Sequence, residues 1–311
     1  MANPSSIEGA PLVPAAMTQW TRRGLERCIE LLLLFAALCS VAITCGIVAI
    51  LVYESAGFFA HVSLVEFFTE TSWTPLFANA RYGILPLVSG TLVTTTVALA
   101  VALPIGTIVA VYLSEFAPPI LREVVKPTLE LLSAVPTVVY GYFALLFVAP
   151  LLQRFIPDLP AQSMLSAGVV MGIMIIPYVS SLSEDAMRAV PKLLREGSYA
   201  LGAGRVQTAF RVVVPAALSG IGAAYILGIS RAIGETMIVA IAAGMQPNFT
   251  FDPREPAATI TAFIVQVSQG DLPHGSIGYQ SIFAAGLVLF CMTLFFNLVG
   301  HVLRRRYREV Y

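Results

Sequence analysis

Long apolar stretches separated by short polar segments dominate this chain. A helix needs about 20 apolar residues to cross the hydrocarbon core of a bilayer, and six stretches are of that length or longer, within a few residues. They cover residues 31–53, 85–113, 129–152, 165–182, 210–244 and 282–303. The pattern therefore predicts an all-α integral membrane protein with six transmembrane helices.

The ends of the chain lie outside these stretches. The first stretch is too long for a signal-peptide core and has no small-residue cleavage site after it, so it is expected to stay in place as a span. Residues 1–28 are then a cytoplasmic N-terminal tail, residues 29–303 a transmembrane domain, and residues 304–311 a basic cytoplasmic tail. Pro136 interrupts the third stretch and Pro177 lies within the fourth.

Composition agrees with the membrane class. Hydrophobic residues make up 57% of the chain and charged residues only 12%, while mean hydropathy is +0.82. A soluble domain cannot keep so much apolar surface away from water. The formal net charge of zero argues against nucleic-acid binding. The four cysteines, Cys28, Cys39, Cys45 and Cys291, show no metal-binding or disulfide spacing.

Basic residues alternate from one loop to the next. Fourteen of the eighteen Lys and Arg residues lie in the N-terminal segment, the loops after the second and fourth stretches, and the C-terminal tail. The other loops hold only Arg81, Arg154 and Arg254. Because cytoplasmic loops carry the excess of Lys and Arg, both termini are predicted to be cytoplasmic. The long outer loops, residues 54–83 and 245–280, are either external docking surfaces or ordinary connections.

The inner segment 184–209 combines charges with helix-forming residues. Its breaks fall at Pro191 and at Gly202–Gly204, which predicts short helices that form a compact knob on the inner face. Leu193, Leu194 and Leu201 supply apolar contact area, and Arg195 and Arg205 are expected to give the knob a polar rim.

This segment resembles the cytoplasmic signature loop of ABC-importer permeases. The spacing of that loop is reproduced throughout. It runs from Glu196-Gly197-Ser198 over three residues to Gly202, and over nine more to residues 212–215, which end in Pro215. Gly197 and Ser198 stand where the family has two alanines, and Gly197 should weaken the local helix by up to about 1 kcal/mol. The resemblance implies a coupling helix that docks on a separate ATPase subunit through Glu196, Gly197, Ser198, Gly202 and Pro215.

Two opposite charges lie inside the fifth stretch. Arg231 is near its middle and Glu235 follows four residues later. A charge at this depth costs at least about 2.5–3.5 kcal/mol and usually faces the interior of a bundle. On a continuous helix the two side chains would pair, and Arg231 offers planar donors that suit a tetrahedral oxyanion. Ser230 and Thr236 can add hydroxyl donors to an anion path. A structural charge network without a ligand is the alternative.

Further segments resemble one subgroup, the membrane subunits of bacterial phosphate importers. These segments are residues 103–116, 129–141 and 231–237. Met237, the N-terminal extension and the long outer loop before the last stretch resemble the C-type (PstC-like) permease more than its A-type partner. The resemblance covers roughly residues 85–303 and implies that the transmembrane domain is a permease of the type I importer fold.

The resemblance also implies partners and a path. It implies a heterodimer with a second related permease, two ATPase subunits that hold ATP and Mg²⁺, a periplasmic phosphate-binding protein, and a place in the lipid of the bacterial inner membrane. Arg231 and Glu235 would line the translocation path of inorganic phosphate. Pro136, Thr137 and Gly141 would bend the third stretch beside the path.

Enzymatic functions find no support in the sequence. The sequence has no P-loop, zinc-protease or nucleophile-elbow motif, so no catalytic residue, cofactor or metal is expected on this chain. A permease for sulfate or molybdate stays open, and so does a membrane scaffold that binds an ATPase without transport. A scaffold has no need of Arg231 inside the membrane, so this residue favours a transporter.

Overall fold

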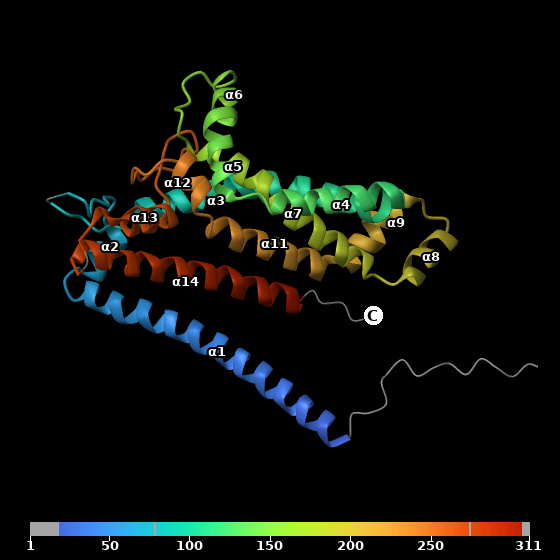
Figure 1. Ribbon diagram of the computed structural model, residues 1–311. Coiled ribbons are helices and arrows are strands. Elements are labelled where there is room, and N and C mark those ends of the chain that lie inside the picture. Colours follow the sequence, from blue (N-terminus) through green and yellow to red (C-terminus); the bar gives the residue numbers. More distant parts are fainter. Residues whose placement is uncertain (1–18, 78, 274, 307–311) are drawn as a thin grey trace, which may run out of the picture. The chain divides into compact units, whose positions relative to one another are not determined.

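The computed structural model describes residues 19–77, 79–273 and 275–306. They fall into two compact units, divided between Leu51 and Val52, each of which is considered by itself. The first unit holds most of α1 (Gln19–Phe59). The second unit contains α2 (Leu64–Thr69), α3 (Leu85–Val111), α4 (Pro119–Ser133), α5 (Thr137–Phe143), α6 (Ala149–Gln153), α7 (Met164–Arg188), α8 (Lys192–Ala200), α9 (Arg205–Thr208), α10 (Val214–Ala216), α11 (Leu218–Ile233), α12 (Met237–Ala242), α13 (Ile260–Gln266) and α14 (Ile277–Arg306) (Figure 1).

The prediction of an all-α fold is confirmed. Over the described ranges the only extended pairing is an isolated bridge between Trp73 and Tyr82. Four helices are long and apolar enough to span a membrane, at residues 25–59, 85–116, 164–188 and 277–302. Two further pairs of helices, each pair joined at a bend, are long and apolar enough when the two halves are taken together. If each pair is one span, the chain has up to six spans. The six-span count, the orientation and the domain boundaries stay predictions.

The third and fifth stretches are the bent ones. Residues 119–133 and 137–153 meet at 88°, which agrees with the break predicted at Pro136. The fifth stretch differs more from its prediction, which was one span over residues 210–244. Residues 205–216 and 218–233 meet at 70°, and the chain breaks again at Gly234 before α12 begins. The apolar periodicity gave no sign of these bends, because each half is apolar enough to continue the helix.

Small residues let the central helices α3 and α7 pack closely. A Cβ added at Gly172 of α7 would lie 2.7 Å from the carbonyl oxygen of Ala98, and one at Gly106 of α3 would lie 2.8 Å from Val179. Within a bilayer, helices associate through such close approach rather than through a hydrophobic driving force. The two helices form the core against which the broken helices are placed.

Wider helical turns precede three prolines. The π-helical segments η1 (Tyr112–Phe116), η2 (Ala144–Val148) and η3 (Ala209–Val213) end shortly before Pro118, Pro150 and Pro215, respectively. Proline lacks an N–H and its ring crowds the carbonyl four residues earlier. A π turn relieves this crowding without ending the helix. Pro215, the last residue of the signature, thus accompanies the η3 segment and the 70° bend that follows.

Aromatic rings hold the two outer loops together. Trp73 and Phe67 are buried in the loop over residues 54–83, and Trp73 lies edge-on to Phe263 of α13 with the ring centroids 5.0 Å apart. A fourth π-helical segment, η4 (Val267–Asp271), continues α13. Edge-to-face pairs of this kind add to the stability gained from burial. The loops 54–83 and 245–280, which the loop charges both assign to the outer side, are therefore in contact. Two loops on the same side of a membrane can meet in this way.

Candidate functional site

The break in the fifth stretch separates the two charges expected to pair. Helix α11 ends at Ile233 with Gly234 as its C-cap, and α12 begins at Met237. Glu235 lies in the break, with its carboxylate Oε1 accepting from the backbone N–H groups of Met237 at 3.2 Å and Ile238 at 3.5 Å. A carboxylate at a helix N-terminus satisfies amides that have no partner within the helix.

The predicted ion pair between Arg231 and Glu235 is wrong. Arg231 lies in the last turn of α11, half-buried, with its guanidinium carbon 4.4 Å from the ring centroid of Tyr178 in α7. Its Nε is buried and has no hydrogen-bond partner, and no acidic group in the described part of the chain forms an ion pair with it. The expectation assumed a continuous helix, and the break at Gly234 takes Glu235 off the face that carries Arg231.

Ser230 and Thr236, the predicted hydroxyl donors, are both engaged. The Ser230 hydroxyl donates to Oδ1 of Asn297 in α14 at 2.8 Å, and the Thr236 hydroxyl donates to the Gly234 carbonyl at 3.3 Å. The Thr261 hydroxyl of α13 donates to the Glu235 carbonyl at 2.7 Å, which satisfies a backbone group that the break leaves open. Hydroxyls thus hold the break in shape.

A tyrosine stabilises the break in the third stretch. Pro136 has no N–H to donate to the carbonyl of Leu132, four residues earlier. The hydroxyl of Tyr140 donates to that carbonyl instead, at 2.8 Å, across the 88° bend. Thr137 is the first residue of α5 after the bend. The sequence predicted the bend from Pro136 but gave no sign of this role for Tyr140.

Gly141 brings the two broken stretches together. A Cβ at this position would lie 2.9 Å from Cδ1 of Ile241 and 3.2 Å from the carbonyl oxygen of Met237, both in α12. Figure 1 shows α5 and α12 side by side. Gly141 is therefore in contact with the fifth stretch, while Pro136 and Thr137 form the entry to α5.

The signature loop forms the predicted knob. Helix α8 begins after Pro191 and ends before Gly202, whose φ of +84° belongs to the left-handed region that favours glycine. The Ala203 N–H donates to the Ser198 carbonyl and the Gly202 N–H to the Tyr199 carbonyl, the hydrogen-bond pattern of a Schellman motif. Glu196 and Gly197 are exposed on α8.

Ser198 has a contact that the family's alanine would lack. Its hydroxyl lies 2.8 Å from the hydroxyl of the buried Thr208 in α9. The side chain thereby joins the two short helices on either side of the Gly202 turn. Leu193 and Leu201 remain 78% and 91% exposed on the same knob. These two leucines are the apolar contact area expected of a docking surface.

Arg195 differs from its prediction as a rim residue. Its side chain is only 17% exposed and forms an ion pair with the 6% exposed Glu115 of η1 at 2.9 Å. Further hydrogen bonds run from its guanidinium to the carbonyls of Met187 and Val190 at 2.8 Å each. The two residues are 80 positions apart, so only the fold reveals the pair.

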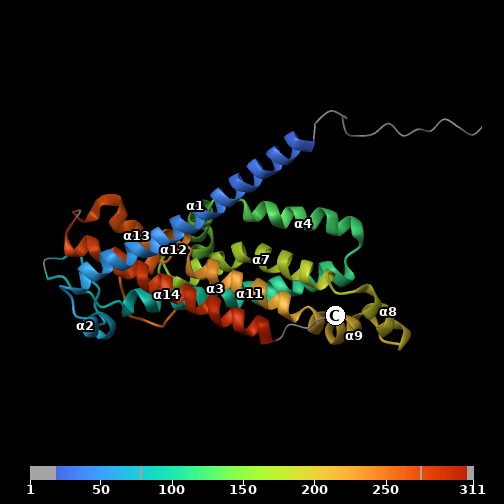
Figure 2. The ribbon, with the colours of Figure 1, turned by 90° about the horizontal axis from the view of Figure 1, so that it is seen from below.

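A second buried carboxylate was missed. Glu184 of α7 is 0% exposed and accepts from Arg122 Nε and Lys126 Nζ of α4 at 2.8 Å each. Asp185 also binds Lys126, and Arg188 lies 3.8 Å from Glu184. Figure 2 shows α4 running beside α7. A buried carboxylate is tolerated when charged donors satisfy it, so these pairs hold α4 against α7.

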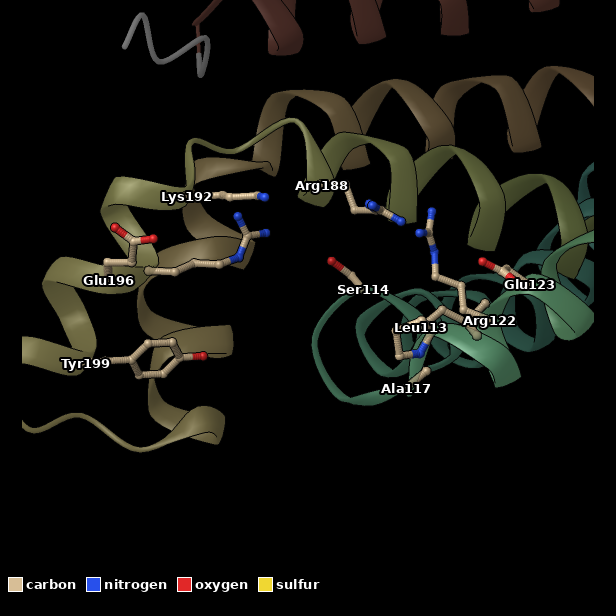
Figure 3. A pocket seen from close by; sticks show the side chains of 11 residues that line it. Leu113, Ser114, Ala117, Arg122, Glu123, Arg188, Lys192, Glu196 and Tyr199 are labelled. Atoms are coloured by element: carbon tan, nitrogen blue, oxygen red, sulfur yellow. The ribbon is translucent and has the colours of Figure 1, made fainter.

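A pocket of about 620 Å³ lies between these two charged contacts. In Figure 3 Lys192, Glu196 and Tyr199 project from α8 on one wall, and Ser114, Arg122 and Arg188 lie on the other. Both signs of charge line it, since Glu123 and Glu196 accompany the basic side chains. Within the described ranges no group of three or more His, Cys, Asp and Glu side chains is arranged to hold a metal ion.

Comparison with known proteins identifies the family. Residues 102–309 match the family described as binding-protein-dependent transport system inner membrane component. A Bacillus subtilis protein named probable ABC transporter permease protein YqgH is 37% identical over 245 residues, 79% of each chain. The phosphate transport system permease protein PstC of Xylella fastidiosa is 32% identical over 262 residues, 78% of this chain and 79% of that one. PstC 1 of Mycobacterium tuberculosis is 32% identical over 280 residues, 78% and 82%.

Solved structures support the same fold. A bacterial alginate ABC transporter, in complex with a periplasmic protein that holds an alginate pentasaccharide, aligns with a TM-score of 0.63 at 18% identity, over 92% of this chain and 98% of that one. The inward-facing MetNI methionine ABC transporter aligns with a TM-score of 0.54 at 17% identity, over 73% and 95%. At these identities the likeness concerns the fold alone. The chain therefore belongs to the family of binding-protein-dependent transport system inner membrane components, as a permease subunit of an ABC importer with the type I fold in the bacterial inner membrane.

Proposed function

We propose that this permease subunit moves inorganic phosphate inward as the C-type half of an ATP-driven importer. The observation that carries the proposal is Arg231 of α11, which is half of a bent candidate span. Its guanidinium is half-buried and forms no ion pair within the described residues. A charge in this position is costly unless it serves a ligand or a partner. Its planar donors suit a tetrahedral oxyanion.

The surroundings of Arg231 fit an anion path. Stacking on Tyr178 holds the guanidinium in one orientation without neutralising its charge. Glu235 directs its carboxylate to the amides of α12, so it does not compete for Arg231. On this proposal Arg231 binds the anion, and Glu235, Ser230 and Thr236 shape the break beside it. Arg231 thus has a specific role, whereas the other three are mainly structural.

The two breaks supply the backbone side of the path. Pro136, Thr137 and Gly141 turn α5 so that it packs on α12, directly after the break that holds Glu235. Non-helical backbone at membrane depth is tolerated where it lines a water-filled cavity or is buried in protein. Both breaks are therefore proposed to line the path.

Helix α8 is the proposed coupling surface for an ATPase subunit. The exposed Leu193 and Leu201 supply apolar area and Glu196 supplies a charge. Gly202 ends the turn after α8, and Pro215 lies farther along, at the bend before α11. The complex would comprise a second related permease, two ATPase subunits with ATP and Mg²⁺, and a periplasmic phosphate-binding protein. This chain would hold no cofactor of its own.

The test is phosphate uptake by the assembled complex in proteoliposomes. Replacing Arg231 with Gln removes the charge and should abolish uptake, whereas Arg231→Lys keeps the charge without the planar fork and should retain only part of it. Arg254→Gln, in an exposed ion pair of the outer loop, serves as the matched control and should transport normally. Normal uptake by the Arg231→Gln complex would rule out the assigned role.

Two further outcomes would identify one of the alternative functions, a permease for another oxyanion or a scaffold without transport. Competition by unlabelled sulfate or molybdate stronger than that by phosphate would identify another oxyanion as the substrate. Stable ATPase binding without movement of any anion by the unaltered complex would identify a scaffold. Several relatives are named phosphate permeases, which favours phosphate.

A further inference from the structure

We propose that Arg195 is a positioning residue that fixes the coupling helix α8 to the inner end of α3, so that α8 and α3 move as one body during transport. The inference rests on the proposed docking of an ATPase at α8. Glu115, the partner of Arg195, lies in η1, which continues α3 over residues 85–116. The pair thus joins the predicted docking surface to a long candidate span.

The geometry of Arg195 suits a rigid link. Its Nε and one terminal nitrogen donate to the two carboxylate oxygens of Glu115, at 3.3 and 2.9 Å. The remaining hydrogen bonds go to the carbonyls of Met187 at the end of α7 and of Val190 in the linker before α8. A guanidinium held by four hydrogen bonds in three segments has little freedom, and such bidentate pairs fix direction as well as distance.

Apolar packing connects the same elements as this contact. Val111 of α3, Met187 of α7 and Val213 of η3 belong to one buried cluster, against which Leu194 of α8 and Phe116 of η1 pack. The cluster draws its side chains from the same elements that the ion pair connects. Because the side chains of Arg195 and Glu115 are only 17% and 6% exposed, losing one partner of the pair is costly.

Other contacts of α8 are local. Its hydrogen bond from Ser198 reaches Thr208, only ten residues away, and Pro191 connects it directly to α7. Among the hydrogen bonds and ion pairs of the described residues, Arg195–Glu115 is the contact that joins α8 to a helix distant in the sequence. A displacement of α8 by an ATPase would therefore reach α3 chiefly through this pair and the apolar cluster beside it.

The first measurement is the rigidity of the link. In complexes whose native cysteines are replaced, spin labels at position 192 of α8 and position 108 of α3, both exposed, report the distance between the helices. One narrow distance distribution is expected, the same without nucleotide and with ATP. Arg195→Gln should broaden it. A distance that changes with ATP in the unaltered complex would overturn the proposal, and this result needs neither phosphate uptake nor a stable variant.

The second measurement is coupling. Glu115→Gln, Arg195→Gln and the double variant should bind the ATPase and hydrolyse ATP at the basal rate, but their substrate movement per ATP should fall by roughly tenfold. The double variant should be no worse than the poorer single variant, since the residues act as a pair. Glu123→Gln is the control, because Glu123 is exposed on the same pocket and forms no ion pair within the described residues.

The outcomes are distinguishable. Unchanged movement per ATP, whether or not thermal stability falls, would leave the pair a purely structural contact and overturn the proposal. Additive losses in the double variant would also contradict it. If the unaltered complex couples ATP hydrolysis to a substrate other than phosphate, the substrate assignment fails while the link between α8 and α3 is still tested.

Discussion

Gly202 shows how a single residue sets the form of the coupling surface. Its positive φ ends α8 and turns the chain towards α9. Gly197, five residues earlier in the same signature, has an ordinary helical conformation. An added Cβ would meet nothing within 4 Å at either position. The two glycines therefore differ in backbone conformation and not in available space, which makes them a matched pair.

Gly202→Ala should destabilise the knob by about 1–2 kcal/mol, because an L side chain is strained in the left-handed region. Gly197→Ala should instead strengthen α8 by up to about 1 kcal/mol, since alanine is the better helix former. Thermal unfolding of the purified subunit and the amount of co-purified ATPase measure both effects. Equal effects of the two substitutions would contradict the assignment of Gly202 to the turn.

Sequence reasoning at this scale succeeded where chemistry was local. The break at Pro136 and the helix ends at Pro191 and Gly202 follow from the residue types themselves. The pairing of Arg231 with Glu235 was wrong, because it depended on a helix that continues through Gly234. The contact between Arg231 and Tyr178 joins different helices, and no spacing in the sequence indicates it.

At the scale of elements, α4 depends on charges for its attachment. None of its residues is buried, and many of its apolar side chains, including Ile120, Val124 and Leu131, are exposed. Its described ion pairs run from Arg122 and Lys126 to Glu184 and Asp185 of α7. The helix is thus held to α7 by a few strong polar contacts. Other pairs of helices, such as α3 and α7, are held together by close apolar packing.

Glu184→Gln should destabilise the packing of α4 on α7 by about 3 kcal/mol, because it leaves Arg122 and Lys126 without the buried carboxylate. Asp185→Asn removes a neighbouring carboxylate that is 56% exposed, against 0% for Glu184, and should cost less than about 1 kcal/mol. Thermal unfolding in detergent compares the two variants. A larger loss for Asp185→Asn would show that the surface pair, and not Glu184, holds the helix.

The network around Glu184 marks a limit of prediction for elements. Arg122, Lys126 and Arg188 were assigned to the inner side from their charge, and they do lie together. The sequence could not show that a carboxylate between them is fully buried, because the partners are about 60 positions apart. Hydrophobic patterns locate helices, whereas the pairing of helices depends on contacts between distant residues.

At the scale of the whole molecule, the contacts agree with the alternation of loop charges. The outer loops meet through Trp73 and Phe263, and the inner segments meet through Glu115 and Arg195. Segments predicted to share a side are therefore in contact. The fold class and family also follow from the apolar stretches and the signature loop. Hydropathy does not indicate the bends. Pro136 predicts the one of 88°, whereas the one of 70° was not predicted.

The predicted orientation can be tested with two single cysteines in a cysteine-free background. Phe251 of the second outer loop and Val206 of α9 are both exposed, at 67% and 61%, so they form a matched pair. A membrane-impermeant maleimide should label Phe251→Cys on intact cells, and Val206→Cys only after permeabilisation, because basic loops stay in the cytoplasm. Labelling of Val206→Cys on intact cells would reverse the orientation.

The aromatic contact between the outer loops also has an optical consequence. The chain contains two tryptophans, Trp20 and Trp73. Trp73 is buried among the rings of Phe67, Tyr82 and Phe263. In a Trp20→Phe variant, assembled with partner chains whose tryptophans are replaced, it would be the single indole emitter, with the short-wavelength fluorescence of a site shielded from water. A shift of this emission to longer wavelength when a periplasmic binding protein docks would report, in real time, the separation of the outer loops.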